Sequence, residues 1–136
     1  MGTGILHSKF SKQKLNVKSS TEAELVGVNE YIFHSIWLLM FMKEQGYEIR
    51  DNILYQDNQS TIRMFKSGRN SCTDNSRHID IRYFFVKDRI YNKEIRVEYC
   101  PTHSMLADYF TKPLQGEPFR MMRDVIMGYN TLDSLI

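Results

Sequence analysis

The sequence of 136 residues predicts an α/β fold, and three features carry this prediction. A short strand at residues 52–57 is followed at once by a short helix at residues 58–66. An apolar stripe at helical spacing comes next, and then an alternation typical of a half-buried strand. The stripe consists of Ile79, Tyr83, Val86 and Ile90, and the alternation of Ile95, Val97 and Tyr99. Strands that alternate with helices favour an α/β layer.

A long helix is expected from Ser20 to about Gly46, with apolar residues on two of its sides. We interpret it as a helix sandwiched between other elements, because both sides need cover. The residues interpreted as core are Trp37, Met40, Met42, Phe84 and Phe85. The apolar stretch 31–42 is shorter than the roughly 20 residues that a bilayer crossing needs, so no membrane contact is expected.

The remaining segments are less regular. Residues 4–18 are expected to be the end of a strand or hairpin, and Asp74, Asn75 and Ser76 are expected to cap the helix that carries the stripe. Helices are expected at about 104–112 and 117–128, and residues 130–136 are expected to form a tail.

Composition excludes several classes of protein. With 18 basic and 16 acidic residues, the net charge of +2 does not by itself imply a nucleic-acid partner, so any such argument must be local. Cys72 and Cys100 are too few for a disulfide scaffold, and we interpret both as free thiols in a reducing compartment.

Three carboxylates are candidates for chemistry, and each has a structural alternative. Glu24 is expected to face the core, and the alternative is a capping box with Thr21 at the helix start. Asp57 ends a strand and opens a helix, where α/β sheets place ligand groups, but it also suits a helix N-cap. Asp108 lies one turn before Lys112, so an ordinary ion pair is its alternative.

Several motifs occur in a fixed order along the chain. They are SSTEAE at Ser19 to Glu24, DNQS at Asp57 to Ser60, RHIDIR at Arg77 to Arg82, and the segment Cys100 to Leu114 with its LAD and TKPL. In these motifs the chain resembles the ribonuclease H domain of copia-type retrotransposon Pol polyproteins, which follows the reverse transcriptase. The resemblance spans about residues 4–129, and linked motifs in order are specific.

The resemblance implies a ribonuclease H-like fold, with a mixed β-sheet flanked by helices, over residues 1–129, followed by the tail 130–136. It implies that Glu24, Asp57 and Asp108 are catalytic metal ligands for two Mg²⁺ ions, which Mn²⁺ can replace. The implied partners are an RNA–DNA hybrid and the reverse transcriptase portion of the polyprotein. The implied location is cytoplasmic, in a virus-like particle, or nuclear, and not secreted.

This sequence departs from the family's pattern at its beginning. The family's first catalytic aspartate lies on the first strand, and here no Asp precedes Asp51. We therefore expect that at least the first strand is missing and that the chain alone cleaves poorly. The alternative is an inactive remnant that binds nucleic acid or a partner chain.

Four basic residues are expected to contact a phosphate backbone: Arg77, Arg82, Lys87 and Arg89. The alternative is a solvated helix face. His103 precedes the last acidic segment, where many ribonucleases H have a histidine that assists product release, but an exposed loop residue is the stronger interpretation. The spacing of Cys72, His78, Cys100 and His103 matches no paired-ligand zinc motif.

Overall fold

The structure is a computed structural model that describes residues 3–14, 16–67 and 77–135, without the side chains of Ser67, Arg77 and His78. The chain divides into two compact units. Residues 13–99 form the first, named here the central unit, and residues 1–12 with 100–136 form the second, named the terminal unit.

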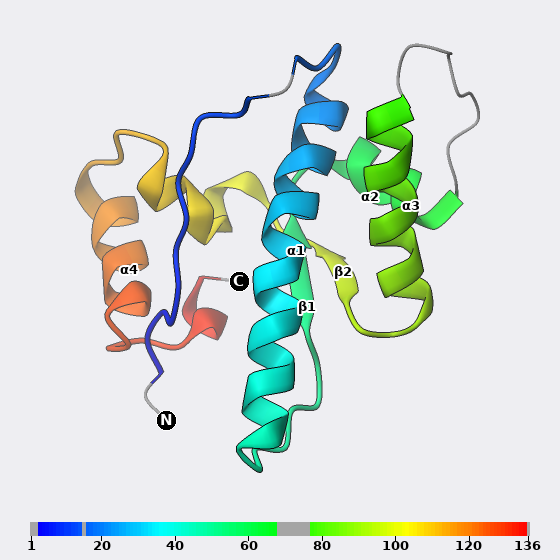
Figure 1. Ribbon diagram of the computed structural model, residues 1–136. Helices are drawn as coiled ribbons and strands as arrows, with labels where there is room; N and C mark the ends of the chain where they lie inside the picture. Colours follow the sequence, from blue (N-terminus) through cyan, green and yellow to red (C-terminus); the bar gives the residue numbers. More distant parts are fainter. Residues whose placement is uncertain (1–2, 15, 68–76, 136) are drawn as a thin grey trace. The chain divides into compact units, whose positions relative to one another are not determined.

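The central unit is an α/β arrangement, as the sequence predicts. Its elements in chain order are α1 (Ser20–Glu44), β1 (Ile53–Gln56), α2 (Gln59–Ser67), α3 (Arg77–Tyr91) and β2 (Arg96–Tyr99) (Figure 1). The two strands are parallel, with Ile53 opposite Arg96 and Gln56 opposite Tyr99. The sheet among the described residues is therefore a parallel pair and not the mixed sheet that was expected.

Helix α1 runs antiparallel to β1, because side chains of α1 reach the sheet at both ends of that strand. Ser35 donates a hydrogen bond from Oγ to Oδ1 of Asn52 at 2.9 Å, just before β1 begins. Gln56, the last residue of β1, donates from Nε2 to Oε2 of Glu24 at 3.3 Å. The amino-terminal turns of α1 therefore lie beside the carboxyl end of β1.

The core of the central unit lies where α1 and α3 pack together. From α1 it takes Leu25, Val26, Val28 and Ile32, and from α3 it takes Ile79, Tyr83 and Val86. Val86 has no exposed surface, and the predicted stripe on α3 is confirmed as a core-facing stripe. Burying such side chains is the main favourable contribution to folding, at about 1.5–3 kcal/mol for each large one.

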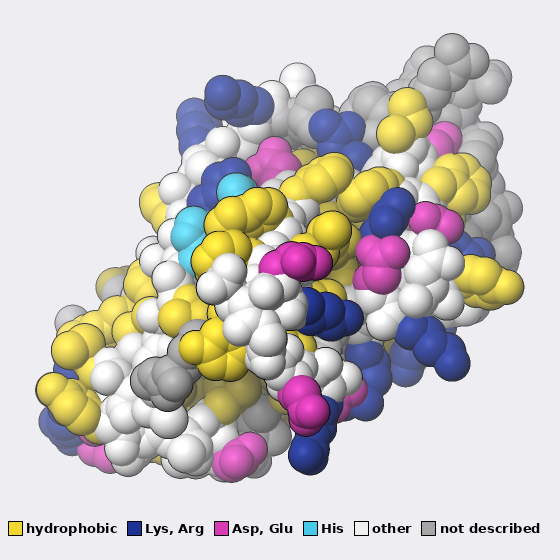
Figure 2. Space-filling view, turned by 60° about the horizontal axis from the view of Figure 1, so that its bottom comes forward, with side chains coloured by type: hydrophobic (Ala, Val, Ile, Leu, Met, Phe, Trp, Pro, Cys, Tyr) yellow, Lys and Arg dark blue, Asp and Glu magenta, His cyan; other side chains and the backbone are white. Residues whose placement is uncertain are grey.

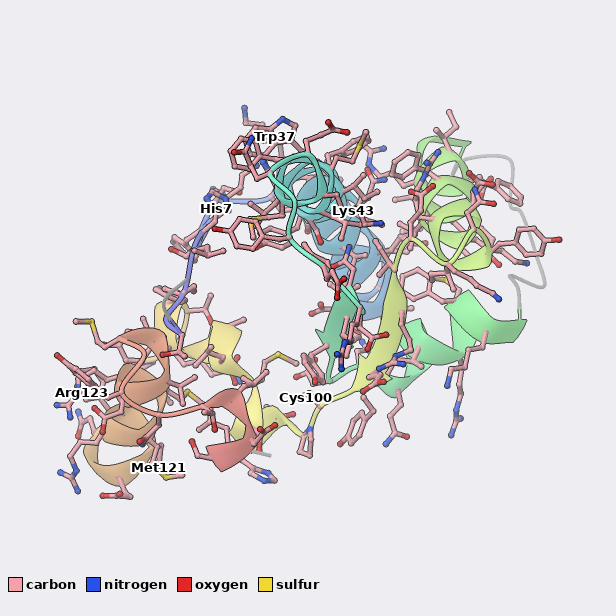
Figure 3. All side chains as sticks on the ribbon, turned by 90° about the horizontal axis from the view of Figure 1, so that it is seen from below. His7, Trp37, Lys43, Cys100, Met121 and Arg123 are labelled. Carbon is pink, nitrogen blue, oxygen red and sulfur yellow. The ribbon has the colours of Figure 1, made fainter. Side chains whose placement is uncertain are left out.

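The prediction that α1 is covered on both sides is wrong. Trp37 is 65% exposed and Met40 is 62% exposed, and Phe84 on α3 is 60% exposed. Trp37 projects from α1 on the side away from the two strands (Figure 3), and hydrophobic side chains are visible at the surface in Figure 2. The buried residues of α1 cluster around Leu25 and Ile32, which shows that only one side of the helix faces the core. Met42 is buried, as expected.

By length and composition alone, α1 is also apolar enough to cross a membrane. The central helix of a protein core passes the same test, and the hydrogen bonds of α1 to the sheet are those of a packed helix. The prediction of no membrane contact therefore stays a prediction.

The terminal unit contains the 3₁₀ helices η1 (Thr102–Ser104), η2 (Leu106–Phe110) and η3 (Leu132–Ser134) and one α-helix, α4 (Gly116–Ile126). The aromatic rings of Tyr109 and Phe119 stack with their centroids 5.2 Å apart, which joins η2 to α4. The helix expected at 104–112 is thus two short 3₁₀ helices separated by Met105.

The expected strand at residues 4–18 is not formed among the described residues. The backbone N–H of Ile5 donates to the carbonyl of Ile126 at 3.0 Å, and no ladder of such bonds continues from it. A strand needs a paired neighbour to satisfy its backbone groups, and none is described beside this segment. The expected cap at residues 74–76 lies outside the described residues.

Candidate functional site

Two of the three candidate carboxylates, Glu24 and Asp57, are brought to the carboxyl end of β1. Gln56, the last residue of β1, joins Glu24 to the turn after the strand: its Nε2 donates to Glu24 at 3.3 Å, and its Oε1 accepts from the backbone N–H of Asn58 at 2.9 Å. Gln56 is only 4% exposed, so this amide is a buried connection between α1 and the turn after β1. The hydrogen bonds of Gln56 thus connect the start of α1 to the turn that follows β1.

Glu24 does not face the core and does not cap its helix, so both interpretations of it from local pattern are wrong. The side chain is exposed. It lies about 100° around the helix from Leu25, which is at the centre of the buried side. Its carboxylate is therefore in contact with solvent, with Gln56 as a neutral donor.

The cap of α1 is made by its neighbours. The Oγ of Ser19 accepts from the backbone N–H of Glu22 at 3.2 Å, and the carboxylate of Glu22 accepts from the backbone N–H of Lys18 at 2.8 Å. This arrangement resembles a capping box placed two residues before the expected one, except that Glu22 accepts from Lys18 and not from the N-cap residue Ser19. Because Glu22 makes the hydrogen bond at the start of α1, the carboxylate of Glu24 is not needed for capping.

The helix that follows Asp57 is capped by the next residue along the chain. The side chain that caps α2 belongs to Asn58, whose Oδ1 accepts from the backbone N–H groups of Ser60 at 3.0 Å and Thr61 at 3.2 Å. Asp57 itself is half-buried. Its position just after a parallel strand is one at which α/β proteins present ligand groups.

Asp108 lies in the terminal unit, on η2, whereas Glu24 and Asp57 belong to the central unit. Its Oδ2 accepts from Nζ of Lys112 at 2.6 Å, and its side chain is 15% exposed. The expected alternative of an i,i+4 ion pair is therefore formed. Such a pair does not exclude metal binding, because Lys112 is half-exposed and its amine can turn to solvent.

Three of the four basic residues proposed for phosphate contact have described side chains, and these three do not share one face of α3. The side chain of Arg77 lies outside the described residues. Arg89 pairs with both oxygens of Glu94 at 3.1 Å and with Asp88 at 3.3 Å, so its charge is largely used within the chain. Arg82 is on the same side of α3 as Arg89, whereas Lys87 is about 140° away from Arg82.

Of the four thiol and histidine candidates for a zinc site, the structure describes the side chains of two. His103 is exposed on η1, as expected for a loop residue, and Cys100 is buried. Cys72 and the side chain of His78 lie outside the described residues. Among the residues with described side chains, no group of three or more His, Cys, Asp or Glu lies close enough to hold a metal ion.

The fit of Mg²⁺ to the residues present is therefore partial. Glu24 and Asp57 provide the hard oxygen ligands that Mg²⁺ prefers, and they do so at one strand end. Two carboxylates are fewer than a complete site for two ions needs. Sequence reasoning missed Gln56, the residue that positions Glu24, although its place between a strand and DNQS was visible.

The structure defines the class of this protein as an α/β chain with two carboxylates at the end of a parallel strand. Comparison with known proteins shows which proteins it is similar to. Over 123 residues, 90% of this chain, it is 28% identical to the Retrovirus-related Pol polyprotein from transposon TNT 1-94 of Nicotiana tabacum. Over 110 residues, 80% of this chain, it is 32% identical to the corresponding polyprotein from transposon RE1 of Arabidopsis thaliana. Over 118 residues, it is 28% identical to the Transposon Ty1-NL2 Gag-Pol polyprotein of Saccharomyces cerevisiae.

The homologues of this chain are thus retrotransposon Pol polyproteins. The matched segment covers 9% of the tobacco polyprotein and 7% of each of the other two, so the chain corresponds to a small part of them. No family model matches the chain, and no solved structure matches it.

Proposed function

We propose that this chain is part of the ribonuclease H domain of a copia-type Pol polyprotein, in which it helps to hydrolyse the RNA strand of RNA–DNA hybrids. The observation that carries the proposal is that two acidic residues lie at the carboxyl end of β1: Glu24, bonded to the last residue of the strand, and Asp57, which follows it, while Ser19 and Asn58 cap the two helices. Homology to Pol polyproteins supports it.

Each residue of the site has a role in this proposal. Glu24, Asp57 and Asp108 would hold Mg²⁺ or Mn²⁺, together with a further carboxylate from outside this sequence. Bound metal supplies an activated water and neutralises charge at the scissile phosphate. Gln56 holds the Glu24 carboxylate in place, and Asn58 takes over the cap that would otherwise occupy Asp57. Selection of the RNA strand rests on its 2′-hydroxyl groups.

The reverse transcriptase portion of the polyprotein is the proposed protein partner. The exposed aromatic side of α1 is consistent with a chain that works inside a larger protein, because Trp37 and Phe41 stack 5.5 Å apart with little cover. An inactive remnant is the competing function, and the ion pair of Asp108 with Lys112 is the observation in its favour.

The test is cleavage of a labelled RNA–DNA hybrid by the chain extended with an amino-terminal strand that carries an aspartate. Asp57→Asn should abolish Mg²⁺-dependent cleavage. Asp51→Asn is the matched control, because Asp51 lies just before the same strand and pairs with Arg96 at 3.5 Å. Equal activity in both variants would contradict the proposed role of Asp57, and no activity in any version would favour the remnant.

A further inference from the structure

A hollow of about 690 Å³ lies in the central unit, at the amino ends of the two strands. It is bounded by the segment before β1, by the end of α2, and by the turn that joins α3 to β2. Because Glu24 and Asp57 lie at the carboxyl end of β1, this hollow is separate from the candidate site. We call it the basic pocket, and its size is within the usual range for small-molecule sites.

The charge of the basic pocket is strongly one-sided. Its lining contains one acidic residue, Asp51, and five basic residues: Arg50, Lys66, Lys87, Lys93 and Arg96. Arg96 forms ion pairs with Asp51 at 3.5 Å and with Glu98 at 2.8 Å. The cationic groups of Arg50, Lys66 and Lys93 have no ion pair or hydrogen bond with the rest of the described chain. The excess positive charge attracts an anion.

The floor and rim of the basic pocket are apolar and aromatic. Phe65 and Ile95 line it and are 3% and 4% exposed, so they form a rigid apolar floor. Tyr91 also lines it and is 85% exposed. An exposed aromatic ring beside a cluster of cations offers a stacking surface for a base next to a place for its phosphate.

The backbone of Lys93 gives an independent reason to assign a function to this pocket. Three helices of the chain, α1, α3 and α4, end in the same turn, in which two backbone N–H groups return to carbonyls of the last helical turn. The residue in the left-handed conformation is Gly46 after α1, with φ 82°, and Gly128 after α4, with φ 78°. After α3 it is Lys93, with φ 59°.

A lysine at this position is less favourable for folding than glycine, because its Cβ is crowded when φ is positive. The turn after α3 closes in the usual way: Glu94 N–H donates to the carbonyl of Arg89 and Lys93 N–H to that of Ile90, both at 3.0 Å. Folding alone would therefore favour glycine here. Strained residues cluster at functional positions, and this one lines the basic pocket.

From these observations we infer that the basic pocket binds a nucleotide unit. The phosphate is held by Arg50, Lys66 and Lys93, and the base stacks on Tyr91 above the apolar floor. The same chemistry is offered by a free nucleotide and by one unit of a single-stranded nucleic acid. The pocket is distinct from the candidate hydrolytic site and does not depend on its metal.

The test is fluorescence anisotropy of a 5′-labelled oligothymidylate of about ten nucleotides, with the full chain in low salt without Mg²⁺. Combining Lys66→Glu with Lys93→Glu should raise Kd by about tenfold or more. Tyr91→Ala should raise it by about fivefold or more. Combining Lys9→Glu with Lys12→Glu is the matched control, since it makes the same charge change outside the lining residues and should change Kd by less than about twofold.

Lys93→Gly separates binding from folding. It should bind the oligonucleotide more weakly than the parent chain while melting at a higher temperature, a combination that a damaged fold cannot produce. Weaker binding together with a lower melting temperature would overturn the role of Lys93.

Competition distinguishes the sources of the ligand. Thymidine 5′-phosphate should displace the oligonucleotide at lower concentration than inorganic phosphate does. An oligonucleotide that binds much more tightly than thymidine 5′-phosphate identifies a nucleic-acid strand as the ligand, and equal affinity identifies a free nucleotide. Inorganic phosphate that competes as well as thymidine 5′-phosphate, or a Tyr91→Ala variant with unchanged Kd, would overturn the inference.

Discussion

Replacing Lys93 with glycine should stabilise the protein, and the size of the effect follows from one backbone angle. At φ 59° an L-residue with a Cβ has a cost of about 1–2 kcal/mol, which glycine does not have. Glycine also makes the unfolded chain more flexible, which removes about 0.4–1 kcal/mol of that gain. The net expectation is an increase of about 0.5–1 kcal/mol in the free energy of unfolding, or a rise of a few degrees in Tm.

The assay is urea and thermal unfolding followed by far-UV circular dichroism. Lys93→Ala is the control, because alanine removes the charge and keeps the strained Cβ, so it should not raise stability. Equal stabilisation by alanine and glycine would show that relief of charge repulsion in the basic pocket explains the effect. A loss of stability in Lys93→Gly would refute the assignment of strain to this residue.

Two further predictions concern α1. Ser19→Ala should lower the free energy of unfolding by about 1 kcal/mol, because it removes the side-chain acceptor for the N–H of Glu22, whereas Ser20→Ala, inside the helix, should not; equal losses in urea unfolding would contradict the assigned cap. Ile32→Ala should cost about 2–5 kcal/mol, because Ile32 is 1% exposed, and Trp37→Ala should cost much less because that ring is 65% exposed. A large loss in Trp37→Ala would indicate that α1 is covered on both sides after all.

Much of the central unit could be predicted from hydrophobic spacing. The strand near Ile53, the helix with Ile79 and Val86, and the long helix from Ser20 all follow from periodicity, and each is confirmed. Periodicity failed for Trp37 because two apolar sides of one helix look alike in sequence, and only packing decides which one is buried.

The residues of the candidate site could be proposed from the sequence, but the residues that cap the helices beside them could not. Capping patterns overlap: both Thr21 and Ser19 are followed three residues later by glutamate, and only the structure shows that Ser19 is the cap. The same holds for Asp57 and Asn58, which are adjacent and both suited to capping. The basic pocket was not predicted, because its residues come from three separate segments of the sequence, 50–52, 65–66 and 87–97.

The central claim is that Glu24 belongs to a nuclease site and that its neighbour Glu22 belongs to the fold. The most direct measurement is Mg²⁺-dependent cleavage of a labelled RNA–DNA hybrid by the chain extended with an aspartate-bearing strand, comparing Glu24→Gln with Glu22→Gln. The account predicts that Glu24→Gln abolishes cleavage at unchanged helix content, while Glu22→Gln keeps cleavage and loses some stability of the α1 start. Cleavage that survives in Glu24→Gln would contradict it.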